Sequence, residues 1–319
     1  MLTVDPNDIV FVGKGLSRPE CVLTTRTGDL FVSDQRGGIS WITPSGQTKF
    51  IEAKDRPEGF LPNGIALMPN RDIMIANLGS ASGVWRMALD GTLKLEISEI
   101  DGRTLPPVNF VGLDREQRLW ITVSTLQVPR EKAFRKGWAD GFIAVDDGHG
   151  PRIVAEGLGY TNEAIVDPTG QWLYVNETIA RRTVRFPITP GASLGPMEII
   201  AEYPPATFPD GLTFDAEGGV WIVSVSSNRI YRVDPGGEIQ LILEDADQEA
   251  LGGIALAFEQ DRFGRTEIDA GKARVLGNLA SIAFGGDDLK TVYLGSLHST
   301  QIGTFRSPIA GAAPVHWEF

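Results

Sequence analysis

The 319-residue chain contains a single cysteine, Cys21. One cysteine excludes an internal disulfide framework and suits a reducing compartment, so the sequence predicts a cytoplasmic protein. Cys21 stands between Glu20 and Val22, and we expect its small side chain to fill space in the core.

Long apolar runs and basic clusters are also missing. No apolar run approaches the ~18 residues that a membrane-spanning helix needs, and the start of the chain has no basic segment followed by an apolar one. Neither a membrane span nor a signal peptide is therefore predicted. The formal net charge of −12 argues against nucleic acid or an anionic membrane surface as partner. We interpret the acidic excess as a solubility feature.

What the chain does contain is material for many short strands. A hydrophobic content of 42% and a charged content of 22% are typical of a soluble globular protein with a sizeable core. The 37 glycines and 20 prolines suit tight turns between strands. Length alone allows one large domain or two ordinary ones.

One unit of sequence recurs along the chain, and its clearest copy is Phe208-Pro-Asp-Gly-Leu-Thr-Phe-Asp215. It places Asp210 at the start of an alternating apolar strand, which continues through a Gly-rich turn into a second strand at residues 220–224. The other copies carry a different residue in the place of Asp210. We call these six positions the ring residues: Glu20, Asn63, Asn109, Asn162, Asp210 and Ala280.

The spacing of the ring residues indicates the fold. The first four intervals are 43 to 53 residues, the length of a propeller blade, and the last interval of 70 residues fits a blade with an insertion. Each repeat shows an apolar strand, a turn and further strands, so we predict a single all-β domain, residues 1–319, folded as a six-bladed β-propeller with four antiparallel strands per blade. Two stacked sandwiches are the alternative, but that fold makes no use of the sixfold spacing.

The start of the chain carries a signal for ring closure. Residues 9–16 precede Glu20 much as residues 152–158 precede Asn162. We therefore expect the N-terminal strand to supply the outermost strand of the last blade and to remove a sheet edge.

Two stretches interrupt the repeat. Residues 125–139 separate the second and third strands of blade three, and residues 244–272 fall between blades five and six. Long connections in compact domains are often functional lids. We call these two stretches the first lid and the second lid, with featureless surface loops as the alternative.

In a propeller the ring residues converge on the central axis. Five of the six bear side-chain oxygens, and carboxylate and amide oxygens are the ligands that a hard cation such as Ca²⁺ prefers. Two carboxylates also offset most of a divalent charge. The competing interpretation is that Asn, Asp and Gly recur because strands begin at turns.

The sequence resembles the gluconolactonase / senescence-marker-protein (regucalcin) group of Ca²⁺-dependent lactonases over essentially its whole length, with diisopropyl fluorophosphatase as a more distant relative. The motifs that carry the resemblance are Pro19-Glu20, Thr161-Asn162-Glu, Asp167-Pro-Thr-Gly-Gln-Trp-Leu-Tyr-Val, Pro209-Asp-Gly-Leu-Thr-Phe-Asp215 and Ser281-Ile-Ala-Phe-Gly-Gly.

The resemblance implies one divalent cation held by Glu20, Asn162 and Asp210, with Asn109 as a further ligand or a substrate contact. Ca²⁺ is the expected ion, with Zn²⁺, Mg²⁺ and Mn²⁺ as alternatives. The cation polarises the lactone carbonyl, and Asp210 is the candidate base. Asn63 is a further candidate for substrate binding.

The chain also departs from the family pattern. Where family members read Arg-Pro-Asn-Asp, this chain reads Pro107-Val-Asn109-Phe110, and Glu163 follows Asn162 where Gly is usual. These changes make the pocket beside Asn109 look less polar. We therefore expect a lactone or ester less polar than a sugar lactone.

Outside the ring, His298 follows the second strand of blade six and is a candidate proton shuttle that contacts substrate. A surface or structural role is the alternative for His298, and it is our expectation for His149 and His316. Asp140 follows the first lid, where turn chemistry explains it as well as substrate contact does.

The sequence thus predicts a metal-dependent hydrolase that opens a lactone or related cyclic ester. A phosphotriesterase-like hydrolase and a non-catalytic propeller with a structural metal stay open as alternatives. A serine hydrolase is not expected, because no Gly-x-Ser-x-Gly turn precedes a helix pattern.

Overall fold

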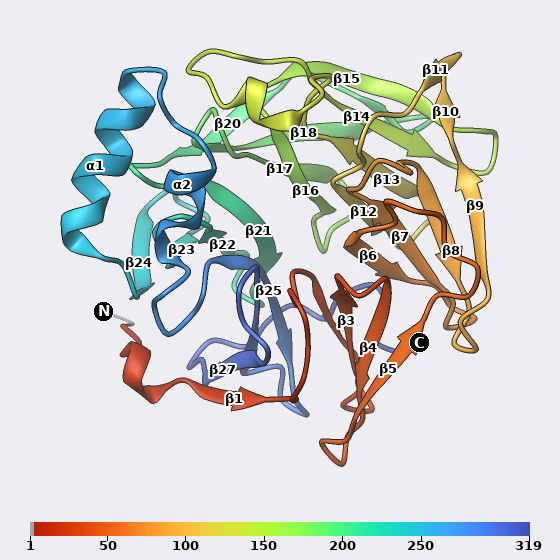
Figure 1. Ribbon diagram of the computed structural model, residues 1–319, viewed down its shortest axis with the longest axis horizontal. Coiled ribbons are helices and arrows are strands. Elements are labelled where there is room, and N and C mark those ends of the chain that lie inside the picture. Colours follow the sequence, from red (N-terminus) through yellow and green to blue (C-terminus); the bar gives the residue numbers. More distant parts are fainter. Residues whose placement is uncertain (1–2) are drawn as a thin grey trace.

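The computed structural model describes residues 3–319 and shows six antiparallel sheets arranged around a central axis (Figure 1). The prediction of a six-bladed β-propeller is confirmed. Blade one consists of β2 (Val22–Thr24), β3 (Leu30–Asp34), β4 (Gly38–Ile42) and β5 (Thr48–Glu52). Blade two consists of β6 (Pro62–Leu67), β7 (Ile73–Asn77), β8 (Val84–Met87) and β9 (Leu93–Ile97). Blade three consists of β12 (Phe110–Leu113), β13 (Leu119–Val123), β14 (Gly141–Asp146) and β15 (Arg152–Leu158). Blade four consists of β16 (Thr161–Val166), β17 (Trp172–Glu177), β18 (Arg182–Thr189) and β20 (Glu198–Glu202). Blade five consists of β21 (Pro209–Phe214), β22 (Val220–Ser224), β23 (Arg229–Val233) and β24 (Ile239–Glu244). Blade six consists of β25 (Leu279–Gly285), β26 (Thr291–Ser296), β27 (Ile302–Arg306) and β1 (Val10–Val12).

The N-terminal strand closes the last blade, as predicted. β1 pairs antiparallel with β27, with Val10 opposite Thr304 and Val12 opposite Ile302. The pairing gives β27 a partner for its outer backbone groups and so removes an open edge.

Three short strands lie outside the predicted pattern. β10 (Glu99–Ile100) and β11 (Arg103–Thr104) form a small hairpin after blade two. β19 (Ser193–Leu194) pairs with the end of β18 and gives blade four a fifth strand. A 3₁₀ turn, η1 (Pro6–Asp8), precedes β1.

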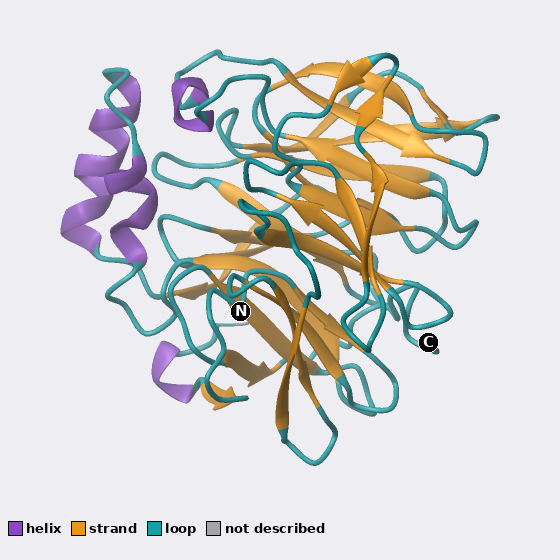
Figure 2. Ribbon diagram, turned by 45° about the vertical axis from the view of Figure 1, so that its right-hand side comes forward, coloured by secondary structure: helices purple, strands orange, loops and turns teal. Residues whose placement is uncertain are grey.

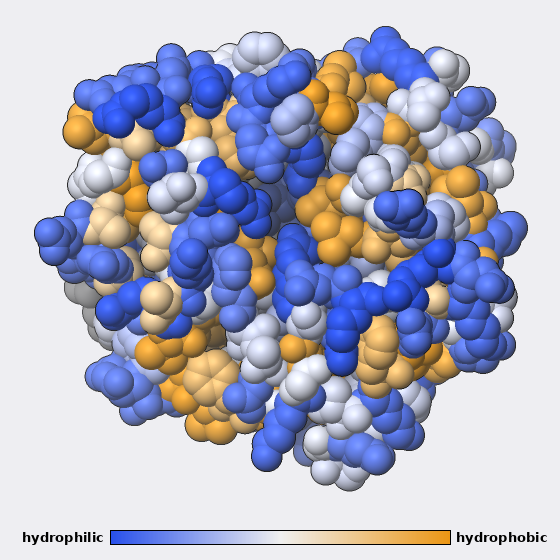
Figure 3. All heavy atoms as spheres, viewed as in Figure 1, coloured by the Kyte–Doolittle hydropathy of each residue, from blue (hydrophilic) through white to orange (hydrophobic). Residues whose placement is uncertain are grey.

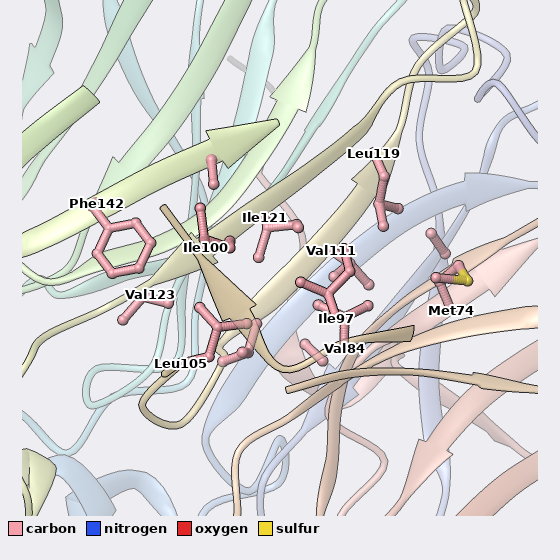
Figure 4. Packing of buried hydrophobic residues seen from close by; sticks show 14 residues of the cluster. Met74, Val84, Ile97, Ile100, Leu105, Val111, Leu119, Ile121, Val123 and Phe142 are labelled. Carbon is pink, nitrogen blue, oxygen red and sulfur yellow. The ribbon is translucent and has the colours of Figure 1, made fainter. Parts of the chain in front are cut away.

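Apolar side chains fill the spaces between neighbouring blades. Between blades two and three, Met74 and Val84 pack in one cluster with Val111 and Ile121, and the four are at most 7% exposed (Figure 4). Every side chain of β3, β7, β13 and β22 is buried, because each of these strands is covered on both faces. This packing makes the axis a rigid frame for the ring residues.

The ring residues stand at irregularities of the inner strands. In blades two, four, five and six the register with the second strand shifts by one residue, for example between Pro209 and Leu212 in β21. The extra residue is a β-bulge, which re-aims a side chain locally. The bulges enclose Asn63, Asn162, Asp210 and Ala280, so the same distortion marks four of the six ring positions.

Both lids are ordered rather than featureless. The first lid contains the 3₁₀ turn η2 (Arg130–Ala133), and the second lid contains α1 (Gln248–Glu259), α2 (Arg265–Ile268) and the 3₁₀ turn η3 (Asp269–Gly271). Helix α1 begins after Asp247, whose side chain accepts hydrogen bonds from the amides of residues 249 and 250. Figure 2 shows the helices of the second lid lying outside the strands on one side of the molecule.

The two lids pack against each other over blades four and five. The ring centroid of Phe263 in the second lid lies 5.9 Å from that of Phe134 in the first lid and 4.3 Å from that of Phe208, two residues before Asp210. Lys136 of the first lid pairs with Glu259 of α1. The lids therefore cover the end of the axis at which the ring residues lie.

The C-terminal segment covers the opposite end of the axis. The amide of Ala312 donates to the carbonyl of Phe214 at the end of β21, and the amide of Arg26 donates to the carbonyl of Trp317. A cavity of about 110 Å³ lies between this segment and the inner strands of the six blades. Among the described residues, no helix has the length and apolar character needed to cross a membrane.

Candidate active site

Four ring residues from four blades form one hydrogen-bonded chain. The side-chain amide of Asn63 donates to Oε1 of Glu20 at 2.8 Å and to the backbone carbonyl of Asn109 at 2.8 Å. The amide of Asn109 donates to Oδ1 of Asn162 at 2.6 Å. These residues are at most 7% exposed. The predicted convergence of Glu20, Asn63, Asn109 and Asn162 is therefore present.

Asp210 joins this group from blade five. Blade four holds the backbone around it, because Asn176 donates to the carbonyl of Asp210 at 2.9 Å and Thr178 donates to that of Pro209 at 2.8 Å. The Thr178 hydroxyl also accepts from the amide of Asn162 at 3.0 Å. The sixth ring residue, Ala280, is fully buried and contributes no polar atom.

Burial makes the two ring carboxylates unusual acids. It raises the pKa of Glu20 to about 7, against the opposing effect of the neighbouring Arg18 and Arg130 charges. Burial also raises the pKa of Asp210 well above its usual range, and the nearby charge of Glu20 raises it further. Two carboxylates that share a buried site repel each other, so a positive charge between them would be stabilising.

The donor set fits a hard divalent cation. Oε2 of Glu20 is buried and has no hydrogen-bond partner. Glu20, Asn162 and Asp210 supply carboxylate and amide oxygens alone. The described part of the chain has no cluster of three or more His, Cys, Asp or Glu side chains arranged for a metal, so amide oxygens would have to complete the coordination.

Asn63 and Asn109, like Asn162, have amide oxygens that already accept a hydrogen bond, whereas Glu20 keeps Oε2 unpartnered. Oδ1 of Asn109 accepts a hydrogen bond from Arg130 at 2.9 Å, and Oδ1 of Asn63 accepts one from Arg18 at 2.9 Å. Both side chains therefore suit the role of holding neighbours or substrate. The ligand role of Asn109 stays a prediction.

The two arginines at the ring were not recognised in the sequence. Arg18 lies two residues before Glu20, and Arg130 comes from η2 in the first lid. The lid position gave no signal, because it has no counterpart in the other repeats. Arg18 did have a signal, since it directly precedes the Pro19-Glu20 motif.

Phe110 does not line the side of the ring that the lids cover. Its side chain borders the cavity on the opposite side of the ring, together with Cys21 and Glu163. The expectation of a less polar substrate rested on the loss of the basic and acidic neighbours of Asn109 and on Glu163, and it stays a prediction. Cys21 is buried, as expected of a core residue.

Glu163 occupies the cavity side of the ring and links two blades. Its Oε2 accepts a hydrogen bond from the backbone amide of Leu212 at 3.0 Å. Burial raises the pKa of Glu163 well above its usual range. A third carboxyl group thus lies beneath the ring, at the position that the sequence marked only as a departure from Gly.

The other candidates lie apart from the ring. The His298 ring lies 3.2 Å from Oδ1 of Asp269 in the second lid, and in the described chain it forms no hydrogen bond to a ring residue. Asp140 accepts from Thr125 and Gln127 within the first lid. His149 is exposed beside Asp147. His316 borders the cavity beneath the C-terminal segment.

Comparisons with known proteins agree with this architecture. A curated relative, 6-deoxy-6-sulfogluconolactonase from Pseudomonas putida, is 24% identical over 218 residues, which span 67% of this chain and 62% of that protein. The calcium-binding protein regucalcin from Agrobacterium tumefaciens superposes with a TM-score of 0.69 at 15% identity, covering 100% of both chains. A gluconolactonase from Xanthomonas campestris superposes with a TM-score of 0.64 at 16% identity, covering 94% of this chain and 88% of that one.

The match with the curated relative spans less than two thirds of that protein's length, and the two structural likenesses show the fold alone. The family is shown by the match between this chain and a family model. Residues 18–245, from Arg18 to the end of blade five, match the model of the SMP-30/Gluconolactonase/LRE-like region. The chain therefore belongs to the SMP-30/gluconolactonase/LRE-like family.

Proposed function

We propose that this protein is a divalent-metal-dependent hydrolase that opens a lactone to the corresponding hydroxy acid. The observation that carries the proposal is the pair of buried carboxylates, Glu20 and Asp210, next to Asn162, with Oε2 of Glu20 unpartnered. The names of the relatives, a sulfogluconolactonase and a gluconolactonase, support the lactone class. The calcium-binding regucalcin supports Ca²⁺ as the ion, with Mg²⁺, Mn²⁺ and Zn²⁺ as alternatives.

Glu20, Asn162 and Asp210 would hold the cation, with Asn109 as a fourth ligand or a substrate contact. A divalent cation held there supplies Lewis acidity that polarises an ester carbonyl. This chain's residues then position substrate and move a proton. Asp210 takes a proton from water as the water oxygen bonds to the carbonyl carbon, and it returns the proton to the ring oxygen as the ring C–O bond breaks.

The lids contribute by limiting access of bulk water. Phe134, Phe208 and Phe263 pack into one apolar cluster over the ring. Excluding water strengthens electrostatic interactions within the site. The face drawn in Figure 1 retains a hollow near its centre, with hydrophilic and hydrophobic side chains on its rim (Figure 3).

The first test is proton release by pH-stat on a panel of lactones, before and after chelation and with Ca²⁺ restored. Metal-dependent release above the spontaneous rate supports the proposal. Release that chelator does not change would remove the metal from the reaction. If no lactone turns over, phosphotriesters are tested next.

A non-catalytic propeller with a structural metal predicts a different result. Chelation would lower the melting temperature, yet neither lactones nor phosphotriesters would turn over. The same protein samples serve both measurements, so the two functions are separated directly.

A further inference from the structure

Two arginines at the ring present buried donors that nothing in the described chain uses. Nη1 of Arg18 and Nε of Arg130 are buried without a hydrogen-bond partner. We propose that Arg18 and Arg130 form an anion subsite, which holds a carboxylate, sulfonate or phosphate substituent of the lactone. The inference rests on the proposed function and deepens it, because it names an anionic lactone as the substrate class.

Arg130 is held in place by neutral partners. Its Nη2 donates to Oδ1 of Asn109 at 2.9 Å and to the hydroxyl of Ser124 at 2.8 Å. Its guanidinium carbon lies 5.2 Å from the ring centroid of Tyr160. One edge of the guanidinium and one face are therefore occupied. The remaining donors are left for a ligand.

Arg18 is held in a backbone conformation that few side chains adopt. Its φ of 48° is in the left-handed region, and the amide of Glu20 donates back to its carbonyl at 2.8 Å. The residues two before the ring residues of blades four and six, Tyr160 and Asn278, also have positive φ, so this conformation belongs to the repeat. Nη2 of Arg18 donates to Oδ1 of Asn63 at 2.9 Å, which leaves Nη1 unpaired.

The two guanidinium groups lie on one patch. The amides that they bind, Asn63 and Asn109, are themselves in contact, with Nδ2 of Asn63 3.5 Å from Oδ1 of Asn109. Burial lowers the pKa of Arg18, the charges of Glu20 and Asp210 oppose that change, and the positive charges of Arg265 and Arg130 lower the pKa further. An arrangement of adjacent guanidinium groups matches the planar or tetrahedral oxygens of an anion.

Charge balance points in the same direction. Neither Arg18 nor Arg130 forms an ion pair with an Asp or Glu side chain in residues 3–319, although the chain as a whole carries a charge of −12. A divalent cation would offset the two charges of Glu20 and Asp210. The positive charges of Arg18 and Arg130, two half-buried side chains, would then remain beside the lactone, and an anionic substituent would offset them.

The test uses lactones that differ in one group. D-Glucono-1,5-lactone is compared with counterparts that carry a carboxylate, a sulfonate or a phosphate at C6, in the wild type and in Arg130→Met. Lys132→Met is the matched control, because Lys132 lies in the same turn, is exposed and donates only to a backbone carbonyl of the first lid.

We expect the wild type to prefer at least one anionic lactone over the neutral one. Arg130→Met should raise KM for that anionic lactone by about ten- to a hundredfold, the size expected for one lost charge-assisted hydrogen bond. KM for the neutral lactone should rise less, because the lost hydrogen bond from Arg130 to Asn109 affects both substrates while the lost anion contact affects only one. Lys132→Met should match the wild type on both. Equal KM changes for neutral and anionic lactones in Arg130→Met would overturn the inference.

Arg18 needs a milder change because of its backbone conformation. Arg18→Lys keeps one positive charge but loses the second donor, so a smaller KM increase on the anionic lactone is expected, with an unchanged melting temperature as the check on folding. An unchanged preference in this variant and in Arg130→Met would exclude the subsite.

A binding measurement separates the failure of this inference from the failure of the proposed function. D-Gluconolactam and D-glucarolactam resist hydrolysis and differ by a C6 carboxylate, and their binding is measured by calorimetry. Preferential binding of the anionic lactam that is lost in Arg130→Met supports the subsite even if no lactone turns over. Lactone turnover together with equal binding of both lactams would support the proposed hydrolase function and overturn the anion subsite.

Discussion

Asp215 and the ring carboxylates Glu20 and Asp210 lie towards opposite ends of the propeller axis and differ in how many hydrogen bonds they accept. At the end covered by the C-terminal segment, both oxygens of Asp215 are fully used. Oδ2 accepts from Arg232 at 2.6 Å and Trp221 at 2.8 Å, while Oδ1 accepts from the amides of Glu217 and Gly219. At the lid end, Glu20 keeps one oxygen unpartnered and Asp210 has a strongly raised pKa.

Blade three repeats the pattern of the first end. Asp114 accepts from Arg118 at 2.6 Å, from Trp120 at 2.8 Å and from two backbone amides. A carboxylate with this many donors stabilises its turn without help from a ligand. Carboxylates that the fold buries without donors destabilise it unless something else binds. The comparison therefore separates aspartates that stabilise turns of the blades from the carboxylates of the ring.

The largest expected effect is the loss of activity in Asp210→Asn. Removing a ligand and a base should lower kcat by about 10²–10⁴-fold. The stability of the metal-free protein should not fall, because a neutral amide is easier to bury than an unpaired carboxylate. Steady-state kinetics and urea unfolding in chelator check the two parts. Wild-type kcat in this variant would show that Asp210 takes no part in the reaction.

The same substitution at the other end should have the opposite profile. Asp215→Asn breaks a buried ion pair with Arg232, which is 6% exposed, so we expect a loss of about 3–5 kcal/mol in the free energy of unfolding. The kcat of the folded fraction should stay near that of the wild type. A stable but inactive Asp215→Asn variant would contradict the division between the two ends.

Metal binding should stabilise the lid end. A ligand at 100 times its Kd adds about 2.7 kcal/mol to the free energy of unfolding. Ca²⁺ should thus raise the melting temperature of the chelated wild type, and the increase should be absent in Glu20→Gln. Asp215→Asn is the control, and it should keep the increase. An equal shift in Glu20→Gln would place the cation elsewhere.

The smallest expected effect concerns the free energy of unfolding at acid pH, and it comes from the end of the axis that the C-terminal segment covers. Burial lowers the pKa of His316 to about 4, below the ~6.5 of an unfolded chain. Between these values the unfolded state binds the extra proton, so this stability is present above about pH 6.5 and is lost as the pH falls towards 4. The wild type should therefore lose about 1–3 kcal/mol more of its free energy of unfolding on acidification than His316→Gln does. Urea unfolding at pH 7 and pH 5 measures this difference. An identical pH dependence of the free energy of unfolding in the two proteins would contradict the prediction.

The repeat made the fold predictable from sequence. The interval between ring residues, together with turns such as Ala216-Glu-Gly-Gly, indicated six blades, and the likeness between residues 9–16 and 152–158 located the closing strand. Helix α1 was missed although Asp247 offers an N-cap, since Gly252 and Gly253 in its middle disfavour a helix. Tertiary contacts with Phe208 outweigh that preference.

The candidate site was only partly predictable, because some of its residues lie outside the repeat. Glu20, Asn162 and Asp210 come from the repeat itself. Arg130 comes from an insertion, and its position depends on how the first lid folds back, which no periodic pattern encodes. The orientation of Phe110 likewise depends on which side of the ring its strand presents, and the expectation of a less polar substrate stays a prediction.

Closure of the sixth blade has a consequence for the order of assembly. The residues on both sides of Glu20 are held by that blade, because the amide of Ser296 donates to the carbonyl of Pro19 at 2.7 Å and the amide of Val22 donates to the hydroxyl of Ser281 at 3.1 Å. Glu20 emerges early during synthesis, yet its neighbours reach their final places only when blade six is complete. Metal binding at Glu20 would therefore report that the whole ring has closed.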